Sequence, residues 1–183
     1  MAGMSAGRKI IWTIGHSTRK IEEFIGLLKE HDITALADVR RYPGSRRHPQ
    51  FGQEQLAKEL GTQGISYVHF PELGGRRPAR RDSPNTAWRN EAFRGYADYM
   101  MTPEFKAGIE RLRCLAEEKP TAIMCAEALW WQCHRGLIAD YLKAEGQRVM
   151  HIVGSGKTEE HPFTSAARIV NGRLSYGDLI SEV

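Results

Sequence analysis

The chain of 183 residues has only three cysteines, and no apolar run approaches the roughly 20 residues that a membrane-spanning helix needs. Three cysteines cannot build the disulfide framework of a small secreted protein. The first eight residues contain neither the apolar core of a signal peptide nor the basic amphipathic pattern of a transit peptide. We therefore expect residues 1–8 to be a flexible tail, the protein to be cytoplasmic, and no membrane to be a partner.

The sequence also lacks internal repeats and low-complexity tracts. Hydrophobic residues make up 41% of the chain and charged residues 26%, which is the composition of a globular protein. The length suits one ordinary domain with a substantial core and is short for two. We expect residues 9–183 to form a single α/β domain.

Apolar, β-prone segments alternate with segments of helical periodicity along the chain. This order predicts a three-layer α/β/α fold with a mostly parallel, Rossmann-like sheet of about five strands and helices on both faces. The pair Asn171-Gly172 predicts a small hairpin near the C-terminus. Strands are expected at 9–16, 33–40, 66–70, 121–127 and 148–153, and helices at about 21–28, 53–61, 93–100, 103–116 and 133–145.

Polar residues gather where the expected strands end. The carboxyl ends of parallel strands share one edge of a sheet, and ligands of open α/β sheets bind outside that edge. Five separate segments place reactive or charged side chains there, a coincidence that packing alone explains poorly. The catalytic residues that this pattern predicts are His16, Asp38, Cys125, Glu127 and Cys133.

Cys133 is the strongest candidate for a nucleophile. It is expected at the start of a helix, where the helix dipole and the neighbouring Arg135 favour a thiolate. His16, His69 or His134 could then serve as a base. The alternative interpretation is that Cys133, like Cys125, is a small buried core residue.

The sequence does not match several well-known catalytic and binding motifs. A phosphatase loop needs arginine six residues after its cysteine, and Trp131 occupies that position after Cys125. The segment Gly154–Thr158 lacks the first glycine of a nucleotide phosphate loop, because His151 stands in its place, and is expected to be a polar turn. No dinucleotide fingerprint follows the first strand, and no closely spaced Cys or His pair indicates structural zinc. We expect no cofactor and no metal.

Positive charge is concentrated between residues 40 and 81, which contain nine lysines or arginines and only three glutamates. Arginine presents a planar fork that suits phosphate and carboxylate groups. The pattern favours an anion site, although the arginines could also form a solubilising surface or pair with Asp38 and Glu127. The predicted anion-binding residues are Arg40, Arg41, Ser45, Arg46, His134 and Arg135.

Taken together, these motifs resemble a known family. The set Thr13–Ser17, Asp38–Arg46, Leu73–Gly75, Cys125–Glu127 and Cys133–Arg135 is similar to the family catalogued as domain of unknown function 488. The resemblance extends from about Lys9 to Ile152. It implies an α/β fold and a cluster of polar residues that indicates enzymatic activity, but it implies no particular reaction. The arginines after Gly75 and the pair Trp130-Trp131 depart from the family pattern.

These observations favour a small enzyme acting on a phosphate-bearing substrate, such as a nucleotide or a nucleic-acid component. A second hypothesis is a nucleic-acid-binding accessory protein, in which Trp88, Trp130 or Trp131 stacks on exposed bases. A third is a thiol redox protein that uses Cys125 and Cys133. The expected partner is a phosphate-bearing small molecule or a nucleic acid.

Overall fold

The computed structural model describes residues 9–177; the expected N-terminal tail at 1–8 and the last six residues lie outside the described residues. The strands are β1 (Ile11–Gly15), β2 (Ala35–Asp38), β3 (Ser66–His69), β4 (Thr121–Cys125), β5 (Val149–Gly154), β6 (Lys157–Glu160), β7 (Arg168–Val170) and β8 (Arg173–Ser175). The α-helices are α1 (Ile21–Glu30), α2 (Gln53–Thr62), α3 (Glu91–Tyr99), α4 (Pro103–Glu118) and α5 (Arg135–Ala144).

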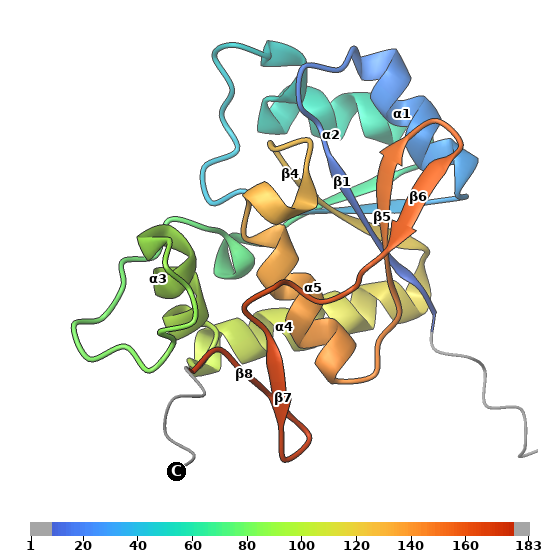
Figure 1. Cartoon of the computed structure of the whole chain (residues 1–183). Coiled ribbons are helices and arrows are strands. Elements are labelled where there is room, and N and C mark those ends of the chain that lie inside the picture. The colour runs from blue at the N-terminus through green and yellow to red at the C-terminus, as the bar shows by residue number, and fades with distance from the viewer. Residues whose placement is uncertain (1–8, 178–183) are drawn as a thin grey trace, which may run out of the picture.

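The central sheet has six strands in the order β3-β2-β4-β1-β5-β6, and its first five members in this order are parallel (Figure 1). The predicted mostly parallel sheet is therefore confirmed. The strands β1 and β2 are parallel but do not pair, because β4 lies between them and pairs with both. This arrangement brings the ends of β1, β2 and β4 together at the middle of one edge.

The sixth strand, β6, was not predicted from the sequence. Its four residues, Lys157–Glu160, are polar and exposed, so they carry no apolar signal of a strand. The chain turns at Gly156, whose φ of +66° suits a tight turn, and β6 then pairs antiparallel with β5. The expected polar turn thus forms the tip of a hairpin at the edge of the sheet.

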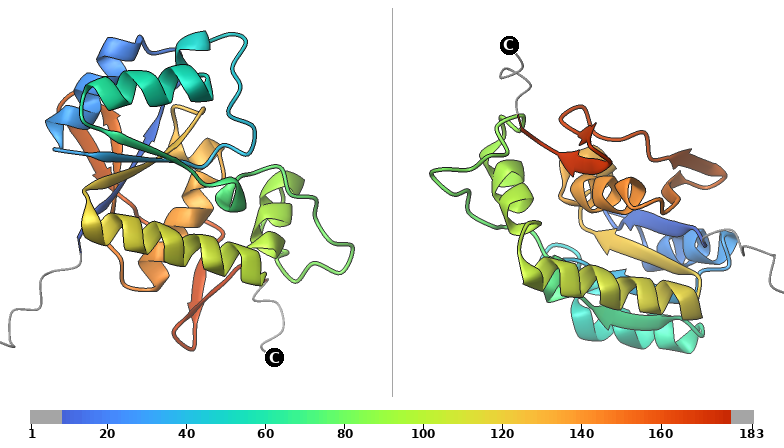
Figure 2. Two further views of the ribbon diagram at one scale, coloured as in Figure 1. Left: turned by 180° about the vertical axis from the view of Figure 1, so that it is seen from behind. Right: turned by 90° about the horizontal axis from the view of Figure 1, so that it is seen from below.

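Helices cover both faces of the sheet, which confirms the three-layer architecture (Figure 2). Alternate residues of β4 face opposite layers: Ala122 and Met124 pack with α1 and α2, whereas Ile123 and Cys125 pack with α3, α4 and α5. Within residues 9–177, no helix combines the length and the apolar character needed to cross a membrane.

The predicted C-terminal hairpin is confirmed as the antiparallel pair β7 and β8. Asn171 and Gly172 have φ angles of +52° and +76°, as a two-residue hairpin turn requires. The hairpin precedes Tyr176, which is buried in the core beside α5 and donates a hydrogen bond to Asp140.

Candidate functional site

A cavity of about 520 Å³ opens at the carboxyl edge of the sheet, where β1, β2 and β4 end. Most of the side chains predicted from the sequence meet there. Asp38 and Arg135 do not line this cavity, but both contact residues that do. The predicted residues on its wall are His16, Arg40, Arg41, Ser45, Arg46, Cys125, Glu127, Cys133 and His134.

Cys125 and Cys133 form a buried dithiol in this wall. Cys125 is the last residue of β4, and its Sγ lies 2.8 Å from Sγ of Cys133. The expectation that a helix starts at Cys133 is wrong by two residues, because Cys133 is extended and α5 begins at Arg135. The backbone N–H of Arg135 nevertheless donates to Cys133 Sγ at 3.3 Å. Cys133 therefore receives the hydrogen bond that a helix N-terminus offers to an anion.

The surroundings shift the pKa values of the two thiols in opposite directions. Burial opposes ionisation of Cys133, but a hydrogen bond from Cys125 and the charges of His134 and Arg135 outweigh it and lower the pKa of Cys133. Burial, together with the negative charge on its neighbour, raises the pKa of Cys125. These opposite shifts favour Cys133 as the thiol of the pair that ionises first, with Cys125 as its hydrogen-bond donor.

Arg40 lines the same cavity as the dithiol and is held in place by Asp38. The carboxylate of Asp38 is fully buried and accepts from Nε of Arg40 at 2.9 Å and from Nη2 at 2.7 Å. Asp38 also accepts from the Arg40 backbone and from the hydroxyl of Tyr67. With these four donors, the carboxylate is occupied in supporting Arg40. The remaining guanidinium nitrogen of Arg40, Nη1, lies 3.5 Å from Nε2 of His16.

His16 is held as a neutral imidazole with one lone pair facing the site. Its Nδ1–H donates to the carbonyl of Ser17 at 2.9 Å, and its ring stacks on Phe51 with 4.4 Å between centroids. Burial lowers the pKa of His16 to about 4. Nε2 is therefore unprotonated near neutral pH and accepts a long hydrogen bond from Nη1 of Arg40.

The other two histidines proposed as bases have structural partners. Nε2 of His69 donates to the Arg40 carbonyl at 2.8 Å, and His69 does not line the cavity. Nε2 of His134 donates to the Val39 carbonyl at 2.8 Å. His134 thereby ties the start of α5 to the end of β2, and its ring remains on the cavity wall.

The predicted ion pairs form only in part. Asp38 pairs with Arg40, as one of the alternatives expected. The side chain of Glu127 is exposed, and within residues 9–177 Arg135 contacts the backbone carbonyls of Glu127 and Ala128 rather than the Glu127 carboxylate.

Arginines dominate the charge of the cavity wall. Arg41 donates to the Arg76 carbonyl at 2.7 Å, and both guanidinium groups lie over the ring of Tyr42. Ser45 accepts from the His48 backbone at 3.0 Å and so closes the loop that carries the exposed Arg46. Glu127 is the one carboxylate among the described residues on the wall, against five arginines: Arg40, Arg41, Arg46, Arg47 and Arg76.

Sequence reasoning missed several residues of the site. Tyr67 holds Asp38, and the buried Tyr96 lines the cavity and donates to the Leu73 carbonyl at 2.7 Å. Neither tyrosine differs in the sequence from an ordinary core aromatic. Asp140 does not line the cavity, but the sequence could have singled it out as a carboxylate within the apolar stretch Leu137–Leu142. In the structure it is fully buried.

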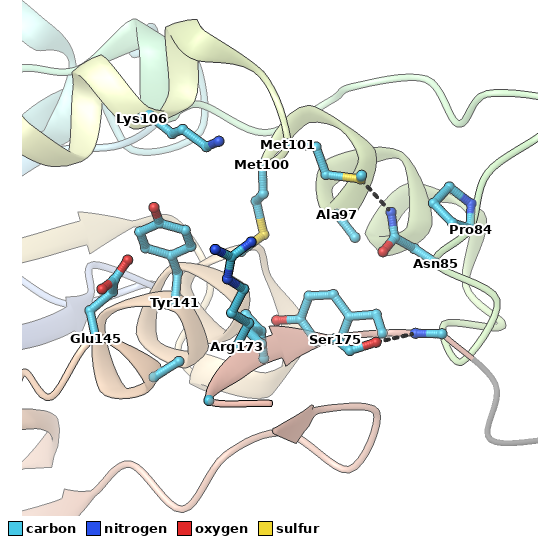
Figure 3. A pocket seen from close by; sticks show the side chains of 15 residues that line it. Pro84, Asn85, Ala97, Met100, Met101, Lys106, Tyr141, Glu145, Arg173 and Ser175 are labelled. Carbon is cyan, nitrogen blue, oxygen red and sulfur yellow. Dashed lines mark hydrogen bonds between the residues drawn. The ribbon is translucent and has the colours of Figure 1, made fainter. Parts of the chain in front are cut away.

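A second hollow, of about 900 Å³, lies between α3, α4, α5 and the C-terminal hairpin (Figure 3). Met100, Tyr141 and Arg173 point into it. The Asn85 amide donates to the sulfur of Met101, and Ser175 accepts from the Gly177 backbone. This hollow contains none of the side chains predicted to be functional, so the smaller cavity at the sheet edge is the candidate site.

No curated protein and no solved structure matches the chain. The family model described as "Domain of unknown function DUF488" matches residues 20–142, well over half of the chain. The matched span contains the two cysteines and the ends of β2 and β4, which form most of the cavity wall. The chain therefore belongs to the DUF488 family.

Proposed function

We propose that the protein is an enzyme that acts on a phosphate-bearing small molecule, such as a nucleotide or a nucleic-acid component, with Cys133 as its nucleophile. One observation carries the proposal: an acidic buried thiol and five arginines share the wall of one cavity. A thiolate is the nucleophilic form of cysteine, and arginine forks suit phosphate oxygens.

The arginines on the cavity wall would have different roles in binding, because some are buried and others are exposed. Arg40 is buried and held rigidly by Asp38, so it would orient the anion close to the dithiol. Arg46 and Arg47 are exposed at the rim, where they would attract the anion from solvent. Each charge-assisted hydrogen bond to a phosphate would contribute roughly 1.5–3 kcal/mol.

The dithiol and His16 would supply the reactive groups. An electron pair of the Cys133 thiolate would form a bond to an electrophilic atom of the substrate, and the leaving group would depart with the electron pair of the bond that breaks. Water would then displace the Cys133 thiolate from the adduct, with its hydroxyl going to the product and its proton to the departed leaving group, and the S–H of Cys125 would again donate to the released thiolate. The unprotonated Nε2 of His16 would orient an attacking water in place of its long contact with Arg40.

Calorimetric titration with inorganic phosphate, nucleotides and sugar phosphates tests the proposal. We expect at least one ligand to bind, and we expect the Arg46→Ala variant to bind it about tenfold more weakly. Arg148→Ala is the matched control, because Arg148 is an exposed arginine that does not line the cavity. Cys133→Ser should bind the ligand but form no covalent adduct in intact-mass measurements. A titration that stays flat for the whole panel at low salt would refute the proposal.

The sulfur–sulfur distance of 2.8 Å favours a second candidate function, thiol redox chemistry. In that reaction the two thiols would lose two protons and two electrons and form a disulfide, while a small-molecule disulfide would be reduced to two thiols. Oxidation should then lower the number of free thiols from three to one. Cys125→Ser separates the two functions, since it retains the proposed nucleophile but cannot form the disulfide. The reducing cytoplasm, which we propose as its location, would keep the pair as a dithiol.

Nucleic-acid binding has less support. Trp88 packs against Phe93 and Tyr176, and Trp130 is stacked on His151. Trp131 packs edge to face with Trp130 and is the one of the three that is half exposed. Binding of single-stranded oligonucleotides but not of mononucleotides, with a steep dependence on salt, would favour this alternative over the enzyme.

A further inference from the structure

A buried chain of hydrogen bonds lies behind the dithiol and ends on Arg135. The side chain of Arg135 is 1% exposed. Its Nη2 donates to the carbonyls of Glu127 and Ala128, in the loop that follows Cys125, at 2.9 and 3.3 Å. Its Nη1 donates to Oγ1 of Thr13 at 3.3 Å. Arg135 thus joins β1 to the loop between the two cysteines.

The chain of hydrogen bonds runs from Arg135 through Thr13 to two buried histidines. Arginine only donates, so Thr13 accepts from it, and the Thr13 hydroxyl also hydrogen-bonds with Nδ1 of His151, 2.5 Å away. Nε2 of His151 hydrogen-bonds in turn with Nδ1 of His161 at 2.8 Å. His161 in turn donates from Nε2 to Asp140 at 2.7 Å.

Asp140 lies at the other end of this chain of hydrogen bonds. Its buried carboxylate also accepts from the backbone and the hydroxyl of Thr164 and from the hydroxyl of Tyr176. These contacts give the Asp140 carboxylate four donors. The buried Arg135 and the buried carboxylate of Asp140 are therefore connected through Thr13, His151 and His161.

The ring of His151 is fixed by packing as well as by hydrogen bonds. It stacks on Trp130, with 4.6 Å between centroids and 6° between the ring planes. Burial, with the nearby His161 and Arg135, lowers the pKa of His151 to about 2, so this ring is neutral. Arg135 cannot release a proton, so the chain cannot deliver one to the cysteines. Its effect on the site must be one of position.

We infer that Thr13, His151, His161 and Asp140 are positioning residues that hold the Arg135 guanidinium and thereby fix the contact between Cys125 and Cys133. The importance of these four residues for catalysis rests on the proposed function of Cys133. Their effect on the acidity of the Cys133 thiol does not depend on that function. When the chain is broken, Arg135 loses a partner for Nη1, and the loop that it ties through Glu127 and Ala128 is released. Cys133 then loses the ordered donors that stabilise its thiolate.

The test is the pH profile of Cys133 alkylation by iodoacetamide, with each cysteine followed by peptide mass spectrometry. The ionisable groups that face Cys133 are Cys125 from β4, His134 and Arg135 at the start of α5, and Tyr96 from α3. Thr13→Val replaces the hydroxyl with a methyl group of similar size and should move the midpoint up by about one pH unit, a tenfold loss of thiolate at lower pH. Thr13→Ser keeps the hydroxyl and should keep the wild-type profile.

Thr121→Val is the matched structural control. Thr121 is also a fully buried threonine on a central strand, but its hydroxyl donates to the Lys119 carbonyl at the opposite end of the sheet. The pH profile of Cys133 alkylation in Thr121→Val should match that of the wild type. Should Thr13→Val fail to fold, His151→Phe breaks the same chain while preserving the stack on Trp130, and the same rise is expected.

A Thr13→Val or His151→Phe profile that coincides with the wild type would overturn the inference, and so would an equal shift in Thr121→Val. Nucleotide binding with no shift would refute the positioning role alone. A shift without any binding of phosphate compounds would refute the proposed function alone.

Discussion

At the scale of single residues, the site depends on buried charges that several partners hold. Asp38 illustrates this, because a fully buried carboxylate is stable only when donors surround it, and Arg40, the backbone and Tyr67 supply them. A carboxylate occupied in this way supports the site and does not exchange protons with a substrate. The sequence indicated that Asp38 and Arg40 belong to the site, but its pattern could not distinguish a supporting residue from a reacting one.

Replacing Asp38 with Asn should leave the charge of Arg40 buried without its partner. We expect the free energy of unfolding to fall by about 3–5 kcal/mol, measured by urea denaturation. Glu160→Gln removes the partner of Arg148 in an ion pair that is more than half exposed, and should change the stability by less than about 1 kcal/mol. Similar losses in the two variants would contradict the structural role of Asp38.

At the scale of elements, the site requires β1 and the loop after β4 to touch. A Cβ atom on Gly15 would lie 1.8 Å from the Glu127 carbonyl oxygen, so any side chain larger than hydrogen would push this loop away from the strand. The close approach allows the backbone of His16 to donate to the Cys125 carbonyl at 2.9 Å. Glycine at the end of β1 is therefore a condition for the hydrogen bond between the His16 backbone and the Cys125 carbonyl.

Gly15→Ala should lower the stability by about 2 kcal/mol or more and slow the alkylation of Cys133, because the obstructing atom is backbone and cannot rotate away. Gly26→Ala is the control: Gly26 is exposed within α1, and an added Cβ meets no atom within 4 Å. That variant should be more stable by roughly 0.5–1 kcal/mol. Denaturation of both variants checks the contrast, and a harmless Gly15→Ala would rule out the close contact.

The elements differ in how well the sequence predicts them. Periodicity and strand propensity located the five parallel strands and the C-terminal hairpin, because their residues are apolar or form a specific turn. The polar edge strand β6 has no such signal, since its pairing comes from the hairpin turn alone. The start of α5 at Arg135 was also missed, because the extended conformation of Cys133 is set by its contact with Cys125, a residue of another element.

At the scale of the whole molecule, buried neutral histidines make stability depend on pH. Burial lowers the pKa of His16 to about 4, below its ordinary value of 6.5. Since the unfolded chain binds the proton more readily, this contribution to stability is complete above pH 6.5 and is lost as the pH falls toward 4. The low pKa of His151 acts in the same direction.

His16→Asn keeps a donor for the Ser17 carbonyl and removes the titrating ring. Between pH 7 and pH 4.5, we expect the free energy of unfolding of the wild type to fall by about 2 kcal/mol more than that of the variant. Urea denaturation at both pH values measures the difference. Parallel losses in the two proteins would show that His16 binds protons equally well in the folded and unfolded states.

The central claim is that an acidic thiol and an anion-attracting wall share one cavity, and a single ratio tests it most directly. Anionic iodoacetate and neutral iodoacetamide both alkylate thiolates, and the ratio of their rates at Cys133 cancels the effects of burial and ionisation that they share. We predict a ratio about tenfold higher in the native protein than in the urea-unfolded chain, reduced by salt and by Arg46→Ala but not by Arg148→Ala. A native ratio equal to or below that of the unfolded chain would contradict the account.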